Sequence, residues 1–187
     1  PGILPGSLPT AAPTRAPLAA QRVFPTPDGA PLRTWVGVGG SPQSVVRAAR
    51  HGLPLVLAII GGDPRRFAPY AALYRRECEK RGLGDLPIAV HSPGHVAATD
   101  DEARERLWPA YRAMHDRIGG ERGWPPLTRA AYDDEIAHGS LYVGSAETVA
   151  RKIAATVGAL GLARFDLKYS AGTLSHAAML DCIARYG

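Results

Sequence analysis

The chain has 187 residues, 45% of them hydrophobic, and a formal net charge of +5. The length suits one domain, and the scattered basic residues, without interleaved aromatic clusters, exclude an ordinary nucleic-acid interface. No apolar run approaches the roughly 20 residues of a membrane span, and no signal-peptide pattern opens the chain, so we expect a cytoplasmic protein without a membrane partner.

The first 31 residues differ in composition from the rest. They hold eight of the 17 prolines. Proline fixes φ and removes a backbone donor, so this stretch suits neither a helix nor a central strand. We expect an extended, partly disordered leader over residues 1–31 and a folded domain over residues 32–187.

The first two strand–helix units follow this leader. A strand is predicted over 34–38, followed by Gly39 and Gly40, with Ser41 capping a helix that begins at Pro42. A second strand is predicted over 54–60. It is apolar throughout, as a parallel strand covered on both faces should be, and Gly61 and Gly62 follow it. Asp63 is expected to cap the next helix.

The pattern then repeats less regularly. A third strand is predicted over 87–91, ending in a turn at 92–94, and Thr99 is expected to cap a long helix. A loop with a short helix follows over 119–138. Ser145 caps another helix, and the run 141–143 before it is compatible with a strand or a loop. The last strand is expected over 163–169 and the last helix over 174–186.

This alternation indicates an α/β fold with a parallel sheet and right-handed crossovers. Four strands are compatible with an open sheet or with half of a closed barrel, and the pattern alone does not decide between them. A complete (β/α)₈ barrel needs about 250 residues, more than this chain has.

Paired glycines at strand ends are the candidate binding residues. Gly39, Gly40 and Ser41 join a strand to a helix N-terminus, where free amides and the helix dipole attract a phosphate. Gly61 and Gly62 repeat the pattern one unit later, at the same end of the predicted sheet. An ordinary tight turn is the alternative interpretation at both places.

Several other residues are weaker candidates. His91 and His95 flank the predicted turn at the end of the third strand, and Lys168 lies near the end of the last one. The Gly144-Ser145 turn also opens a helix. Cys78 and Cys182 have no metal-ligand spacing and are expected to be buried thiols, and no metal site is predicted. No catalytic acid, base or nucleophile is assigned.

Three segments resemble the luciferase-like monooxygenase family. They are WVGVGGSPQSVVRAARHGLPLVLAIIGG, IAVHSPGHVAATDDEARE and LYVGSAETVARKIAATVGALGLARFDLKYSAG, and together the resemblance covers roughly residues 14–187. It implies a partial TIM (β/α)₈ barrel, with the four strands here corresponding to strands five to eight. It also implies a reduced flavin, FMN or F420, a small-molecule substrate, and flavin phosphate contacts at Gly39, Gly40 and Ser41, with Gly61 and Gly62 on the same rim.

The region before residue 32 departs from the family pattern, because nothing there matches strands one to four. We therefore expect a truncated or partial chain, whose open edges invite self-association into a homo-oligomer. The alternative to a flavin-dependent oxidoreductase is a non-catalytic α/β remnant that self-associates or docks on a partner chain. A third hypothesis is a small open-sheet protein that binds another phosphate ligand.

Overall fold

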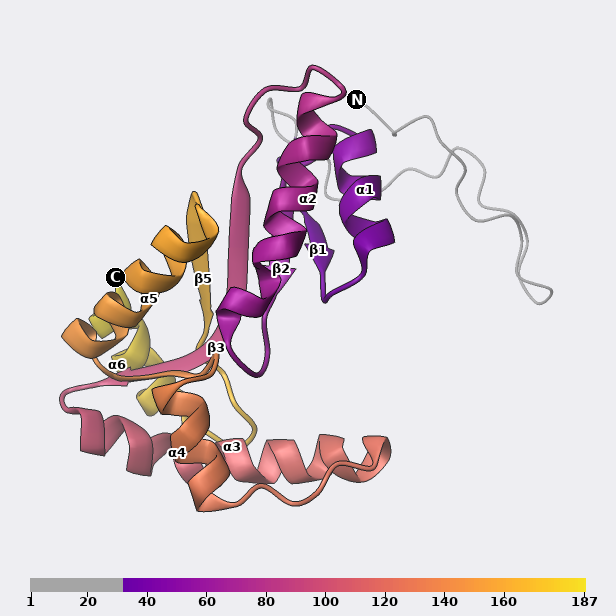
Figure 1. Ribbon diagram of the computed structural model, residues 1–187. Coiled ribbons are helices and arrows are strands. Elements are labelled where there is room, and N and C mark those ends of the chain that lie inside the picture. Colours follow the sequence, from indigo (N-terminus) through magenta and orange to yellow (C-terminus); the bar gives the residue numbers. More distant parts are fainter. Residues whose placement is uncertain (1–31) are drawn as a thin grey trace, which may run out of the picture. The chain divides into compact units, whose positions relative to one another are not determined.

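The computed structural model describes residues 32–187 of the chain (Figure 1). The predicted leader over 1–31 lies outside the described residues. Residues Trp35–Gly187 form one compact unit, and all the helices and strands named here belong to it. No helix in this part of the chain is long and apolar enough to cross a membrane.

The four predicted strands form one parallel sheet. β1 (Val36–Val38), β2 (Leu55–Ala58), β3 (Ile88–Ala97) and β5 (Arg164–Lys168) pair side by side in the order of the sequence. Parallel neighbours joined by right-handed crossovers in sequence order keep their helices on one face. In a doubly wound open sheet the strand order reverses at one point, and here it does not. Strands that follow one another in sequence order are typical of a segment of a (β/α)₈ barrel, so the half-barrel alternative is confirmed.

The third strand differs most from its prediction. β3 continues to Ala97, so the turn predicted at residues 92–94 is wrong. The first part of β3 pairs with β2 and β5, and residues 94–97 pair with β4 (Tyr142–Ser145), the run whose strand character the sequence left open. Ser92 and Pro93 pair with β5 and Gly94 pairs with β4, so long-range pairing holds this tripeptide extended, against its local preference for a turn.

The helices begin close to where their caps predict. Ser41, Thr99 and Ser145 each accept a hydrogen bond from the backbone amide three residues on, at the starts of α1 (Pro42–Arg50), α3 (Asp100–Arg122) and α5 (Ala146–Leu160). Asp63 caps a 3₁₀ turn, η1 (Pro64–Phe67), and α2 (Ala68–Glu79) follows it. The remaining helices are α4 (Arg129–Ala137) and α6 (His176–Tyr186).

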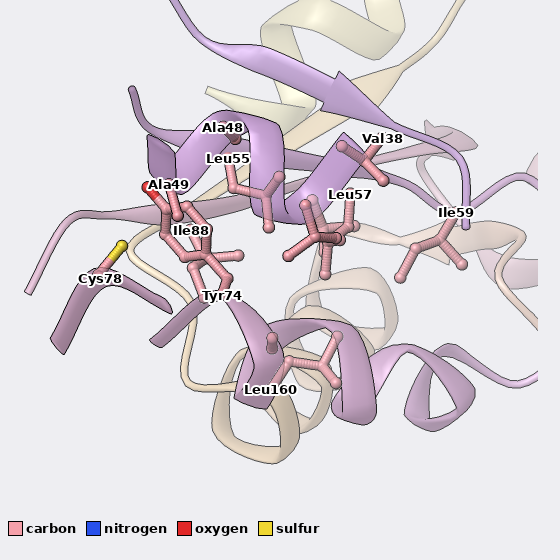
Figure 2. Packing of buried hydrophobic residues seen from close by; sticks show 13 residues of the cluster. Val38, Ala48, Ala49, Leu55, Leu57, Ile59, Tyr74, Cys78, Ile88 and Leu160 are labelled. Atoms are coloured by element: carbon pink, nitrogen blue, oxygen red, sulfur yellow. The ribbon is translucent and has the colours of Figure 1, made fainter. Parts of the chain in front are cut away.

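One face of the sheet packs against α1, α2 and the end of α5. Figure 2 shows Leu55 and Ile88 near Tyr74 of α2, while Val38 and Leu57 lie farther along the same cluster. A second apolar cluster joins α3 and α4 to β4. Burial of such clusters is the main stabilising contribution to the fold. The predicted burial of the two cysteine thiols is also confirmed.

Candidate active site

Both predicted glycine turns line one cavity of about 650 Å³. Gly39 and Gly40 follow β1, while Gly61 and Gly62 follow β2. β1 and β2 are parallel neighbours, so both turns leave the sheet at the same edge. Ser41 lies outside the cavity lining. Its hydroxyl accepts a hydrogen bond of 3.3 Å from the Ser44 amide, which makes it the cap of α1.

The first turn is open toward the cavity. Within residues 32–187, no side chain accepts a hydrogen bond from the amide of Gly39 or Gly40. Gly40 has a φ of +115°, which a residue with a side chain rarely adopts. A Cβ on Gly39 would meet no atom within 4 Å. This corner therefore combines accessible amides with the positive end of α1 and suits an anion.

The second turn is already occupied by the protein itself. The Glu135 carboxylate, on α4, accepts hydrogen bonds from the Gly62 amide through both oxygens, with 3.1 Å to Oε2. Gly61 and Gly62 thus lie on the cavity rim, where the sequence places them. The Gly62 amide is nevertheless not available to a ligand unless Glu135 moves.

The third glycine turn, Gly144-Ser145, also binds a carboxylate of the chain itself. The Asp100 carboxylate accepts hydrogen bonds from the Ser145 amide at 2.7 Å and from the Thr148 hydroxyl at 3.0 Å. The hydrogen bond from the Ser145 amide lowers the pKa of Asp100 below its ordinary value. The Gly144-Ser145 turn therefore joins the starts of α3 and α5. Among the three glycine turns, only Gly39-Gly40 has amides free of an internal carboxylate in the described residues.

Arg66 adds a cation to the cavity wall. Its guanidinium makes no salt bridge with any carboxylate of the described residues, whereas its neighbour Arg65 is paired with Asp63 at 2.7 Å. A Cβ on Gly62 would lie 3.1 Å from Nη1 of Arg66, so the charge sits beside the second turn. Arg66 was not predicted as a site residue. The only sequence signal is a basic residue in the helical turn after a glycine pair.

Aromatic side chains form much of the remaining wall. Phe67 and Tyr70 come from η1 and α2, while Tyr111, Trp124 and Tyr132 come from α3, the loop after it and α4. Burial raises the pKa of Tyr111 to about 12, so its hydroxyl stays protonated at neutral pH. An apolar, aromatic wall with one anion-binding corner suits a ligand that has a flat ring and an anionic tail.

The weaker candidates lie elsewhere. His91 is half-buried on β3, and His95 is fully buried on the same strand. The Lys168 ammonium donates a hydrogen bond to the Ser170 carbonyl at 3.0 Å. The structure therefore does not bring these three residues to the cavity that holds the glycine turns.

One family model and several solved structures are similar to the chain. The model of a family described as luciferase-like monooxygenase matches residues 8–163. No curated protein matches the chain. Among solved structures, the monooxygenase RslO1 from Streptomyces bottropensis is similar with a TM-score of 0.65 at 21% identity, over 82% of this chain and 46% of that one.

Two further solved structures are named with their cofactors. The oxygenating constituent of 3,6-diketocamphane monooxygenase from Pseudomonas putida, in complex with FMN, gives a TM-score of 0.50 at 21% identity, over 72% of this chain and 41% of that one. The coenzyme F420-dependent tetrahydromethanopterin reductase from Methanopyrus kandleri gives 0.51 at 16%, over 81% and 49%. The chain thus spans about half the length of these structures.

Proposed function

The chain belongs to the luciferase-like monooxygenase family, and we propose that it binds a flavin, FMN or F420, with the flavin phosphate at the Gly39-Gly40 turn. One observation carries this proposal. The only glycine turn of the three whose amides are free of an internal carboxylate in the described residues shares a cavity with the unpaired Arg66 guanidinium and an aromatic wall.

The residues present fit such a ligand. The Gly39 and Gly40 amides and the N-terminus of α1 would hold the phosphate, and Arg66 would neutralise part of its charge. Phe67, Tyr70 and the aromatic residues of α3 and α4 would exclude water from the ring. A bound reduced flavin supplies electrons for transfer to oxygen or to a small-molecule substrate. The oxidoreductase activity of a whole enzyme is part of the same proposal.

A second copy of the chain is the partner that we propose. Within residues 35–187, β1 pairs only with β2 and β5 only with β3, which leaves two parallel strand edges without a partner. An eight-stranded barrel needs four more strands, and a second copy would supply them by placing its β1 beside β5. Beside β5, the outer face of α6 exposes Leu180, Ile183 and Tyr186.

Flavin titration tests the binding proposal. Quenching of FMN fluorescence should give a dissociation constant in the micromolar range, and riboflavin, which lacks the phosphate, should bind more weakly. Arg66→Gln should weaken FMN binding about ten-fold, the effect of losing one charge-assisted hydrogen bond. Riboflavin affinity should stay the same in this variant, because only the phosphate meets the guanidinium.

Matched controls separate this effect from general damage. Arg65→Gln removes the neighbouring charge, which is paired with Asp63 outside this cavity, and should leave FMN affinity unchanged. Gly39→Ala adds a Cβ into the open corner and should weaken FMN binding. Gly158→Ala adds one in open space on α5 and should not. Equal affinity for FMN and riboflavin in the wild-type chain would refute a phosphate site.

A further inference from the structure

We propose that Glu135 is a specificity-determining residue, which closes the Gly61-Gly62 turn to anions and confines a ligand's anionic group to the Gly39-Gly40 end of the cavity. This inference rests on the proposed flavin site. The second turn has the geometry of an anion site, and the anion that it holds is a side chain of the chain itself.

The carboxylate fits tightly into its place. Glu135 reaches the Gly62 amide across 73 positions of sequence, and the Ser140 amide donates a further, longer hydrogen bond of 3.4 Å to Oε1. A Cβ on Gly139 would overlap Oε2 of the same carboxylate. A side chain at position 139 would therefore displace the carboxylate from this place.

The charge of Glu135 is not cancelled by an ion pair. Within residues 32–187, no Lys, Arg or His nitrogen lies within 4.0 Å of its carboxylate oxygens. The nearby Lys152 ammonium instead donates to backbone carbonyls, at 2.6 Å to Ile136 and 3.0 Å to Leu141. Burial lowers the pKa of Lys152 to about 8, although Glu135 acts in the opposite direction.

This placement puts a negative charge between two cavities. Glu135 and Gly62 line both the 650 Å³ cavity and a neighbouring one of about 430 Å³. A phosphate in the larger cavity meets attraction at the Gly39-Gly40 end and at Arg66, and repulsion at Glu135. A ligand with one terminal anionic group can place that group near Gly39-Gly40 and keep the rest of the molecule, which is uncharged, near Glu135. The affinity of a neutral ligand does not depend on the charge of Glu135.

The test compares FMN with riboflavin in a charge-removing variant. Glu135→Gln keeps an acceptor oxygen for the Gly62 amide but loses the charge. We expect FMN to bind about five-fold more tightly, because a like charge has been removed, while riboflavin affinity stays within about two-fold. Asp134→Asn is the matched control, since its exposed carboxylate contacts only His138 and lies outside the larger cavity. It should change neither affinity.

The other outcomes are equally informative. Weaker binding of both flavins by Glu135→Gln would overturn the inference and make Glu135 an acceptor for the flavin ring or its polar chain. Unchanged FMN affinity would also overturn it. No FMN binding by the wild-type chain would refute the proposed flavin site itself, whatever the variant does. Glu135→Ala, with thermal unfolding of each variant, distinguishes loss of charge from loss of fold.

Discussion

At the scale of single residues, His95 is the most unusual buried group. It lies on β3 with no exposed surface, and neither ring nitrogen has a hydrogen-bond partner in the described part of the chain. Burial lowers its pKa, and Arg106 lowers it further, while Asp181 and Glu102 act in the opposite direction. The folded state therefore favours the neutral imidazole.

His95 should make stability depend on pH. Its folded-state pKa lies below the unfolded value near 6.5, so the unfolded chain takes up the proton first as the pH falls. The free energy of unfolding should be highest above pH 6.5 and decline below it, by at most about 1.4 kcal/mol per pH unit for one proton. Urea unfolding of the wild-type chain and of His95→Leu between pH 7.5 and 5 measures this slope. The variant should lose it.

The exposed His51 supplies the control. His51→Gln should keep the pH dependence of the wild-type chain, because this residue lies at the surface after α1. Equal slopes for the wild-type chain and His95→Leu would show that the buried imidazole does not govern acid sensitivity.

The residues that could be predicted at the site are those with local signals. The glycine pairs follow apolar strands and precede helix caps, so their position was readable from neighbouring residues. Arg66 and Glu135 depend on tertiary contacts, and the Glu135 contact spans 73 residues. No local sequence pattern predicts that a carboxylate from α4 will bind the Gly61-Gly62 turn and leave the Gly39-Gly40 turn free. For the same reason, the sequence did not distinguish the open turn from the filled one.

At the scale of elements, the free edges of β1 and β5 and the exposed face of α6 predict self-association. Leu180 and Ile183 are 52% and 43% exposed, and a charge at both positions should disrupt a contact made there. Sedimentation should show a dimer of the wild-type chain and a monomer of the double variant Leu180→Glu, Ile183→Glu. Leu83→Glu, at an exposed leucine of the loop after α2, should remain dimeric. A wild-type chain that stays monomeric at all concentrations would contradict the proposal.

Strand positions were predictable to within a few residues where hydrophobic runs were flanked by glycine or proline. β4 and residues 94–97 of β3 were not, because these two segments form by pairing with each other. Helix starts were predicted well, since a cap is a hydrogen bond within three residues. Local signals thus defined where elements begin, and long-range pairing decided how far a strand extends.

At the scale of the whole molecule, four strands in barrel order bring the open glycine turn, Arg66 and Glu135 to one cavity. The similar solved structures are about twice as long as this chain. The described residues nevertheless contain both ends of the proposed site, the anion corner and the aromatic wall. Binding of a flavin phosphate is therefore expected of this chain by itself, whatever further strands an active enzyme needs.

Amide NMR of the ¹⁵N-labelled chain during titration with FMN tests this claim most directly. We expect the largest shifts at the Gly39 and Gly40 amides and a small shift at the Gly62 amide, which already donates to Glu135. Riboflavin should leave the Gly39 and Gly40 signals nearly unmoved. Shifts concentrated at Gly62, or none at Gly39 and Gly40, would contradict a phosphate site at the first turn.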